Sequence, residues 1–162
     1  MASALRILVL EDNPPDAELA VRALKTAGWR VEWRCVETEQ TFRQALEAES
    51  WDLILADFSV PGFGAAAALE HLQHTNRDLP VIVVSGSIGE EMAVTLLRAG
   101  AYDFVMKGHL TRLASAVERA LREAEQRREK QLAEQERGVL ATRWRLLLAH
   151  ALDGVVLQQA VR

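Results

Sequence analysis

Short apolar runs alternate with segments of helical periodicity over most of this chain. The apolar runs lie at 5–10, 31–35, 53–56, 80–84 and 102–106, and the second of them alternates apolar with polar residues. Between the runs, apolar residues recur at helical spacing in the stretches that follow residues 13, 38, 64 and 89. The pattern therefore predicts five strands, each followed by a helix.

Residues that commonly begin and end helices stand at the edges of these stretches. Pro14 and Pro15 suit a first helical turn, because the missing N–H of proline has no helical partner there. Thr38 can cap the second helix with its hydroxyl group. Gly28 and Gly100 follow the first and fourth helices, where glycine commonly ends a helix. These residues indicate the helix boundaries independently of the apolar pattern.

Continuous apolar strands separated by helices are typical of a parallel sheet that is covered on both faces. Right-handed crossovers leave few arrangements of five such strands, and the order 2-1-3-4-5 is a common one. We therefore predict an α/β protein with a flavodoxin-like, doubly wound parallel sheet, extended by a long C-terminal helix. In such sheets the working site lies beyond the carboxyl ends of the strands.

Composition narrows the class of protein without naming a function. The chain has 162 residues, 49% of them hydrophobic, and a formal net charge of -4. The charge gives no indication of a nucleic-acid surface, and no run is apolar enough to span a membrane or serve as a signal peptide. The single cysteine, Cys35, falls on an apolar position of an alternating strand, so we expect it to be buried. We expect a cytoplasmic protein with neither nucleic acid nor membrane as a partner.

Polar residues end four of the five predicted strands. The first strand ends in Glu11 and Asp12, the third in Asp57, the fourth in Ser85 and the fifth in Lys107. Carboxylates gathered at one edge would repel and raise each other's pKa, and a hard divalent cation such as Mg2+ would remove that cost. A cation, a lysine and a hydroxyl are the parts that phosphoryl transfer needs, since it depends on positioning and charge neutralisation.

Four stretches that carry these residues resemble the response-regulator receiver domain of two-component signalling. They are VLEDNPPDAEL, LILADFSVPGFG, PVIVVSGSIGEE and RAGAYDFVMK, and the resemblance covers residues 4–124. It implies a phosphoacceptor switch that receives a phosphoryl group from a histidine kinase or a histidine phosphotransfer protein and passes a conformational change to a C-terminal output. It also implies that the domain is not an enzyme.

The resemblance assigns a role to each residue at the strand ends. Asp57 is the implied phosphoacceptor. Asp12, Asp57 and the backbone carbonyl of Ser59 would bind Mg2+ directly, and Glu11 would act mostly through water. Lys107 would contact the phosphoryl oxygens.

Two further residues would carry the signal. Ser85 would also contact the phosphoryl group, and Phe104 stands where the family has a switch aromatic, often tyrosine. Phe104 as an ordinary core residue is an equal alternative. The family usually has proline after the lysine, but Gly108 stands here, so we predict a trans Lys107–Gly108 bond.

Two other functions compete with the switch. A haloacid-dehalogenase-type phosphohydrolase also uses an aspartyl nucleophile and Mg2+, but it needs a second aspartate two residues later, where this chain has Ser59. A degenerate receiver that serves only as a dimerising interaction module would not need all five strand-end residues. Both alternatives are therefore weaker than the switch.

The last third of the chain predicts one long helix over residues 109–150. Residues 122–137 are mostly charged and contain neither glycine nor proline. Apolar residues near a 3.5-residue period give a weak coiled-coil seam, formed by Leu121, Leu132, Val139 and Leu146. We expect a parallel homodimer held mainly by this helix.

Residues 143–162 resemble the opening of a PAS sensor domain. In that family a helix leads through a pair like Asp153-Gly154 into a first strand. The chain is too short to hold the rest of such a domain, so we expect a truncated start and a longer natural protein.

Overall fold

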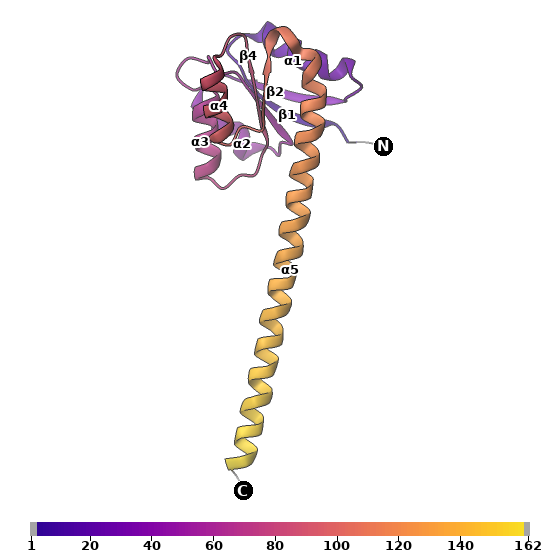
Figure 1. Ribbon diagram of the computed structural model, residues 1–162, viewed down its shortest axis with the longest axis vertical. Helices are drawn as coiled ribbons and strands as arrows, with labels where there is room; N and C mark the ends of the chain where they lie inside the picture. Colours follow the sequence, from indigo (N-terminus) through magenta and orange to yellow (C-terminus); the bar gives the residue numbers. More distant parts are fainter. Residues whose placement is uncertain (1–2, 161–162) are drawn as a thin grey trace. The chain divides into compact units, whose positions relative to one another are not determined.

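The structure, a computed structural model, describes residues 3–160, with side-chain surroundings for residues 3–153. The chain divides into two compact units at Ala124 and Glu125. The first unit contains a five-stranded parallel sheet in the order β2-β1-β3-β4-β5, as the sequence predicts. Figure 1 labels three of its strands, β1, β2 and β4. Its strands are β1 (Leu5–Leu10), β2 (Val31–Val36), β3 (Leu53–Ala56), β4 (Val81–Ser85) and β5 (Asp103–Met106).

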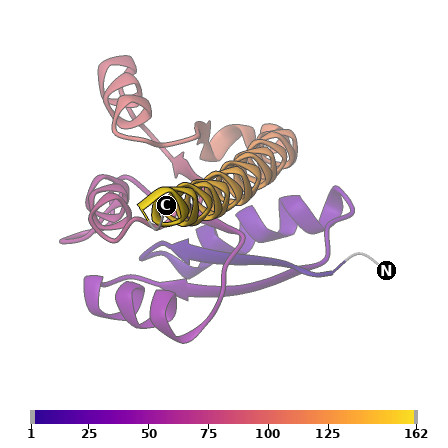
Figure 2. The same ribbon diagram turned by 90° about the horizontal axis from the view of Figure 1, so that it is seen from below.

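Helices cover both faces of this sheet, so the first unit has three layers (Figure 2). Residues of α2 (Glu39–Ala48), α3 (Ala65–His74) and α4 (Glu90–Arg98) pack on one face. Residues of α1 (Pro14–Thr26) and the first turns of α5 (Leu113–Ala160) pack on the other. The central strands are apolar on both sides, because β1, β3 and β4 alternate their side chains between two buried cores.

The helix ends follow the local signals in the sequence. The Thr38 hydroxyl accepts a hydrogen bond from the backbone N–H of Thr41, and the Thr41 hydroxyl accepts one from the backbone N–H of Thr38. Two prolines occupy the first turn of α1. Gly28 and Gly100 adopt φ values of 101° and 110°, which favour glycine at a helix end. The predicted helix boundaries at these positions are confirmed.

Strand register places the carboxyl ends of β1 and β3 side by side. Leu10 is the partner of Ala56, so the next residues, Glu11 and Asp57, leave the sheet together. The backbone N–H of Asp57 donates to the carbonyl of Leu10, which extends the pairing by one step. The edge at which the sequence predicts a site is therefore formed by adjacent strands.

Three local expectations have a definite outcome. The Lys107–Gly108 bond is trans, as predicted, since the described residues contain no cis peptide. The prediction that Cys35 is buried is wrong, because β2 is an edge strand and leaves the thiol exposed. The final helix begins at Leu113 instead of residue 109, after a 3-10 turn, η1 (Lys107–Arg112).

The second unit is helical throughout its described part. Helix α5 continues to Ala160, so the strand expected after Asp153-Gly154 is absent from the described residues. A lone strand would leave its backbone groups without partners, whereas a helix satisfies its own. The PAS-like identity of residues 143–162 stays a prediction.

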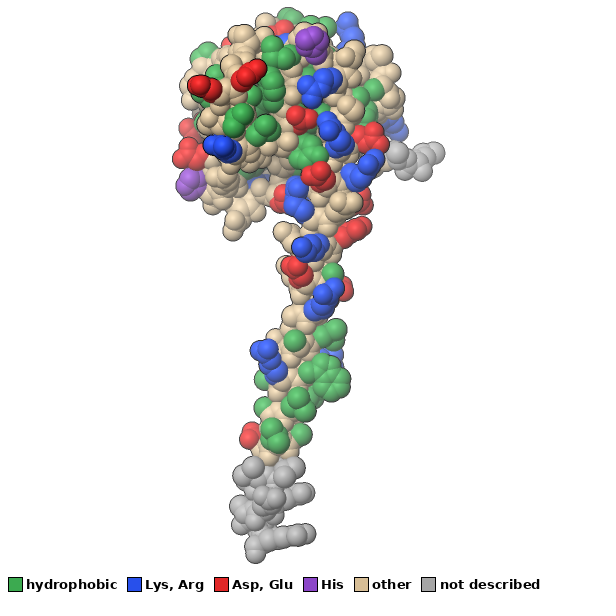
Figure 3. All heavy atoms as spheres, viewed as in Figure 1, with side chains coloured by type: hydrophobic (Ala, Val, Ile, Leu, Met, Phe, Trp, Pro, Cys, Tyr) green, Lys and Arg blue, Asp and Glu red, His purple; other side chains and the backbone are tan. Residues whose placement is uncertain are grey.

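Apolar side chains on this unit lie open to solvent, and Figure 3 shows hydrophobic side chains gathered along it. The exposed large ones are Leu132, Val139, Leu140, Trp144, Leu146, Leu147, Leu148 and Leu152. Leu121 differs from them, because it lies within the first unit and packs against its core. No helix in the described part of the chain is both long enough and apolar enough to cross a membrane.

Gly64 ends the loop between β3 and α3, and backbone atoms of that loop occupy the space where a side chain at this position would lie. A Cβ added at Gly64 would lie 2.5 Å from the Phe58 carbonyl oxygen, closer than real Cβ contacts come. Gly89 is also a helix N-cap in extended conformation, but nothing lies within 4 Å of its added Cβ. The two glycines therefore form a matched pair.

We expect Gly64→Ala to lower the free energy of unfolding by about 1–3 kcal/mol more than Gly89→Ala, because only the first substitution overpacks the loop. Urea unfolding of both variants measures the difference in unfolding free energy. Both glycines are helix N-caps, so the loss that comes from replacing glycine by alanine at an N-cap is the same in both variants and cancels in the difference. Equal losses in the two variants would contradict the close approach at Gly64.

Candidate functional site

Three carboxylates gather beyond the carboxyl ends of β1 and β3. Glu11, Asp12 and Asp57 each offer one oxygen, and these atoms all lie within 4.8 Å of one another. Glu11 and Asp57 are buried, with 5% and 6% of their surfaces exposed, whereas Asp12 is exposed. Residues separated by 45 positions in the sequence therefore form one acidic cluster, as their strand-end positions predict.

Backbone hydrogen bonds fix the two buried members of the cluster. The N–H of Glu11 donates to the carbonyl of Val36 on the neighbouring strand. The carbonyl of Asp57 accepts a bond from the N–H of Ala65 at the start of α3. Side-chain oxygens also accept local backbone donors: Glu11 Oε1 from Asn13 at 3.1 Å and Asp57 Oδ1 from Ser59 at 3.2 Å.

Lys107 brings a positive charge to this cluster from the end of β5. Its Nζ atom lies 2.8 Å from Glu11 Oε2 and 3.1 Å from Asp57 Oδ2. A third carboxylate, from Asp16 in the first turn of α1, lies 2.8 Å from the same nitrogen. The ammonium group thus touches three carboxylates, and the third is not part of the cluster that could hold a metal.

Burial and charge shift the pKa values of two of these groups. Burial raises the pKa of Glu11 from its ordinary 4.5 to about 7, with the Asp57 charge adding to the rise and Lys107 opposing it. Burial alone would lower the pKa of Lys107, but its hydrogen bonds to Asp16, Glu11 and Asp57 outweigh that effect and raise it. The lysine is therefore firmly charged, while Glu11 ionises only at a cost.

Ser85 lies at the same sheet edge, at the end of β4. Its residue is fully buried, and its Oγ atom has no hydrogen-bond partner among the described residues. Buried hydroxyl groups in proteins are normally bonded, so an unbonded one is unusual. This hydroxyl is free to accept a new partner at the edge of the sheet.

For two other residues predicted from the sequence, Ser59 and Phe104, the structure shows no contact that tests the predicted role. Ser59 meets Asp57 through its backbone N–H, and no described contact involves its carbonyl oxygen. Phe104 is half-buried on β5, where it pairs in register with Val83 of β4. The structure thus leaves both the metal-binding role of Ser59 and the switch role of Phe104 as predictions.

Asp16 is the member of the site that sequence reasoning missed. An acidic residue in a first helical turn is normally explained by the favourable charge at a helix N-terminus. The available signal was its place in the first turn of α1, which directly follows the end of β1 and so begins near the strand ends. That signal is weak without knowledge of where the lysine side chain lies.

The cluster suits a hard divalent cation. Carboxylate oxygens are the ligands that Mg2+ prefers, and one or two of them suffice when waters complete the shell. Glu11, Asp12 and Asp57 present such oxygens close together, and the exposed Asp12 leaves an open side for water and for a further group. These three residues would therefore hold the ion.

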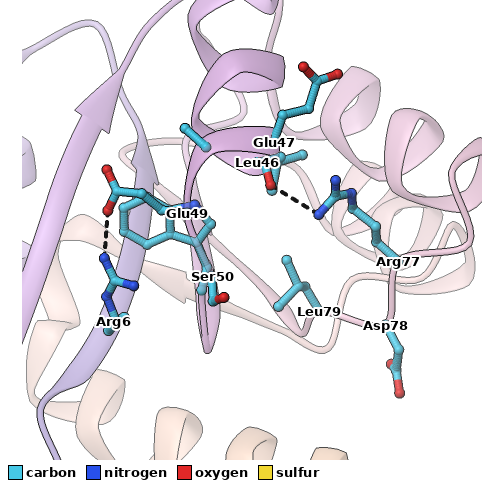
Figure 4. Close-up of a pocket in the computed structure, with 10 residues that line it drawn as sticks. Arg6, Leu46, Glu47, Glu49, Ser50, Arg77, Asp78 and Leu79 are labelled. Carbon is cyan, nitrogen blue, oxygen red and sulfur yellow. Dashed lines mark hydrogen bonds and ion pairs between the residues drawn. The ribbon is translucent and has the colours of Figure 1, made fainter.

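A separate hollow of about 700 Å³ lies at the opposite edge of the sheet, near the starts of β1, β3 and β4 (Figure 4). Its charged lining is already engaged: Arg6 pairs with Glu49, and Arg77 donates to the carbonyl of Leu46. Both arginines of this hollow already have partners in the protein, so we place the functional site at the acidic cluster.

Comparison with known proteins agrees with this geometry. A family model described as the response regulator receiver domain matches residues 7–118. The phosphate regulon regulatory protein PhoB of Escherichia coli is 35% identical over 109 residues, which cover 64% of this chain and 45% of PhoB. The response regulator PilR of Pseudomonas aeruginosa is 29% identical over 121 residues, covering 74% of this chain and 27% of PilR.

Solved structures share the same fold. NtrX from Brucella abortus superposes with a TM-score of 0.72 at 29% identity, covering 84% of this chain and 30% of NtrX. A CheY-like receiver domain protein from Methanospirillum hungatei gives a TM-score of 0.65 at 26% identity, covering 77% of this chain and 99% of that one.

The chain spans less than half the length of PhoB and of PilR, so the similarity concerns one domain of each relative. Within that domain, the family match covers the whole sheet from Ile7 onward and the first turns of α5. The chain belongs to the response regulator receiver domain family.

Proposed function

We propose that this domain is a phosphorylation-driven switch in which Asp57 is the phosphoacceptor. The observation that carries the proposal is a cluster of carboxylates that suits a metal ion and contacts a lysine ammonium. Glu11 and Asp57 both make that contact, and the match to the receiver-domain family favours Asp57, at the end of the third strand, as the phosphoacceptor. Asp57 contributes to the cluster with Glu11 and Asp12, and its Oδ2 atom lies 3.1 Å from Lys107 Nζ. The Asp57 carboxylate is buried, and its two oxygens accept hydrogen bonds from the Ser59 N–H and from Lys107 Nζ, which fix its orientation.

The proposed reaction transfers a phosphoryl group from a phosphohistidine of a histidine kinase or phosphotransfer protein. One Asp57 oxygen forms a bond to phosphorus while the phosphorus–nitrogen bond of the donor breaks, and the electron pair stays on the imidazole nitrogen. Bound Mg2+ would supply charge neutralisation for the phosphoryl oxygens. Lys107 adds a second positive charge, and Ser85 offers its unbonded hydroxyl to one oxygen.

Asp57 should take up one phosphoryl group from acetyl phosphate only when Mg2+ is present. The intact mass of the wild-type chain should rise by one phosphoryl group, and that of Asp57→Asn should not. Asp52→Asn is the matched control, because Asp52 precedes the same strand and bonds the backbone of Arg6 at the opposite edge. An unmodified wild type under these conditions, or modification of Asp57→Asn, would contradict the assignment.

We propose further that the signal leaves through Ser85, β5 and α4. A phosphoryl oxygen would draw the Ser85 hydroxyl toward it, and the half-buried Phe104 on the next strand could then fill the space released. Helix α4 is lightly anchored, since Leu96 is its buried residue while Met92, Val94 and Leu97 are exposed. An element with few buried contacts shifts readily between two packings.

Phosphorylation should change backbone amide exchange in residues 86–108, with slower exchange in the loop at 86–89 that follows Ser85. Hydrogen-exchange mass spectrometry before and after treatment with acetyl phosphate and Mg2+ measures this, and Asp57→Asn treated in the same way is the control. Ser85→Ala should weaken the change, because it removes the hydroxyl that links the two regions. Changes confined to α1 and α2 would rule out this route.

We propose finally that two chains pair in parallel through the second unit. Leu132, Val139 and Leu146 recur every seven residues, and between 59% and 68% of each side chain is exposed. Polar residues between them would weaken the seam and allow it to shift, which suits a transmitter of conformational change. Leu121 is excluded from the seam that we propose, because it belongs to the first unit and packs against its core.

Val139→Glu should weaken dimerisation about tenfold or more, equivalent to about 1.4 kcal/mol, by placing a charge in the seam. Ala141→Glu is the control, since two residues turn a helix by about 200° and place the same charge on the other side. Sedimentation equilibrium at tens of micromolar measures both. A monomeric wild type, or equal loss in the two variants, would contradict the proposal.

Crosslinking then tests the orientation of the pair. The exposed native thiol requires a Cys35→Ser background. In that background, Leu132→Cys and Leu146→Cys should each give disulfide-linked dimers if the helices are parallel, because each residue then faces its own copy. An antiparallel pair can bring at most one of the two positions together.

A further inference from the structure

Asp16 makes a contact that its place in the helix does not require. It is the third residue of α1, where an acidic side chain commonly reaches back to the N-cap backbone. Here the N–H of the N-cap residue Asn13 donates to Glu11 instead, and Asn13 makes no side-chain cap. The Asp16 carboxylate is turned to Lys107, with 2.8 Å between Oδ2 and Nζ.

Lys107 therefore has two kinds of carboxylate partner. Glu11 and Asp57 belong to the cluster that suits a divalent cation, but Asp16 does not. A cation bound by the cluster would repel the ammonium group and take over the charge of two of its three partners. Asp16 lies outside the cluster, and its side chain is 30% exposed. It is therefore the one of the three carboxylate partners of Lys107 that would not bind the cation.

We propose that Asp16 is a positioning residue that holds the Lys107 ammonium beside the cation when a divalent cation occupies the acidic cluster. The proposal rests on the cation site assigned under the proposed function. Asp16 lets the lysine move off Glu11 and Asp57 without losing every ion pair, so the site accepts the cation more easily. It also keeps the ammonium close to Asp57, where a phosphoryl group would need it.

The direction of the effect follows from competition between two cations. Without Asp16, the ammonium has only Glu11 and Asp57 as described partners, so a divalent cation must displace it with no carboxylate left to receive it. Removing the lysine as well removes the competitor. The contribution of Asp16 should then largely vanish, because it acts through Lys107.

A double-mutant cycle on Mg2+ affinity tests this proposal. Isothermal titration calorimetry would give the Mg2+ dissociation constants of the wild type, Asp16→Asn, Lys107→Ala and the double variant. Asp16→Asn should weaken binding about fivefold in the wild-type background, at the low end of coupling between linked sites. In the Lys107→Ala background the same substitution should change binding by less than about twofold.

Glu18→Gln controls for net charge, because it removes one negative charge from an exposed position on the same helix. It should leave Mg2+ affinity unchanged in both backgrounds, and thermal unfolding of Asp16→Asn without Mg2+ checks that the variant is folded. If Asp16→Asn weakened Mg2+ binding equally in both backgrounds, Asp16 would act only by electrostatic attraction of its own carboxylate for the cation. That result would overturn the positioning role. So would an Asp16→Asn affinity equal to that of the wild type.

The outcome also separates this inference from the proposed function. A wild-type chain that binds no Mg2+ would overturn the cation site itself and this inference with it. A wild type that binds Mg2+ together with an unaffected Asp16→Asn would overturn the inference alone.

Discussion

Carboxylates held close together at the edge of a sheet repel one another, so their negative charge must be neutralised. The arrangement of charged side chains at this edge provides that neutralisation. Two unit charges at 4 Å repel by about 4 kcal/mol under the effective dielectric constant typical near a protein surface. Glu11 and Asp57 are buried and therefore cannot rely on water, which is why the pKa of Glu11 rises to about 7. Lys107 relieves the repulsion by contacting both residues.

The fold produces this charge problem and also its solution. Parallel strands bring all their carboxyl ends to one edge, so residues distant in sequence meet there without any long loop. The pairing of Leu10 with Ala56 sets Glu11 against Asp57, and the pairing of Ser85 with Met106 sets Lys107 beside Gly86. Strand register therefore specifies which carboxylates lie side by side and from which strand end the lysine side chain starts.

The sequence predicts the parts of the molecule that depend on local pattern or on strand order. The sheet order, the strand positions within one or two residues and the cluster of Glu11, Asp12 and Asp57 are confirmed. Asp16 could not be recognised, because its contact depends on where a long lysine side chain ends rather than on a periodic pattern. Cys35 was misplaced because alternation along a strand does not reveal that the strand lies at the edge.

Helix α5 shows where sequence pattern stops determining structure. Its first turns bury Leu113, Ala116, Val117 and Ala120 against the sheet, as any covering helix does. Beyond Ala124 the apolar residues continue, but no described residue packs over them, so large side chains such as Trp144 stay open to solvent. A helix satisfies its own backbone hydrogen bonds without a partner, whereas its apolar surface still favours burial. The core of the first unit thus fixes the start of this helix, whereas among the described residues no apolar partner covers the part beyond Ala124. The exposed apolar side chains of that part therefore favour burial against a further apolar surface.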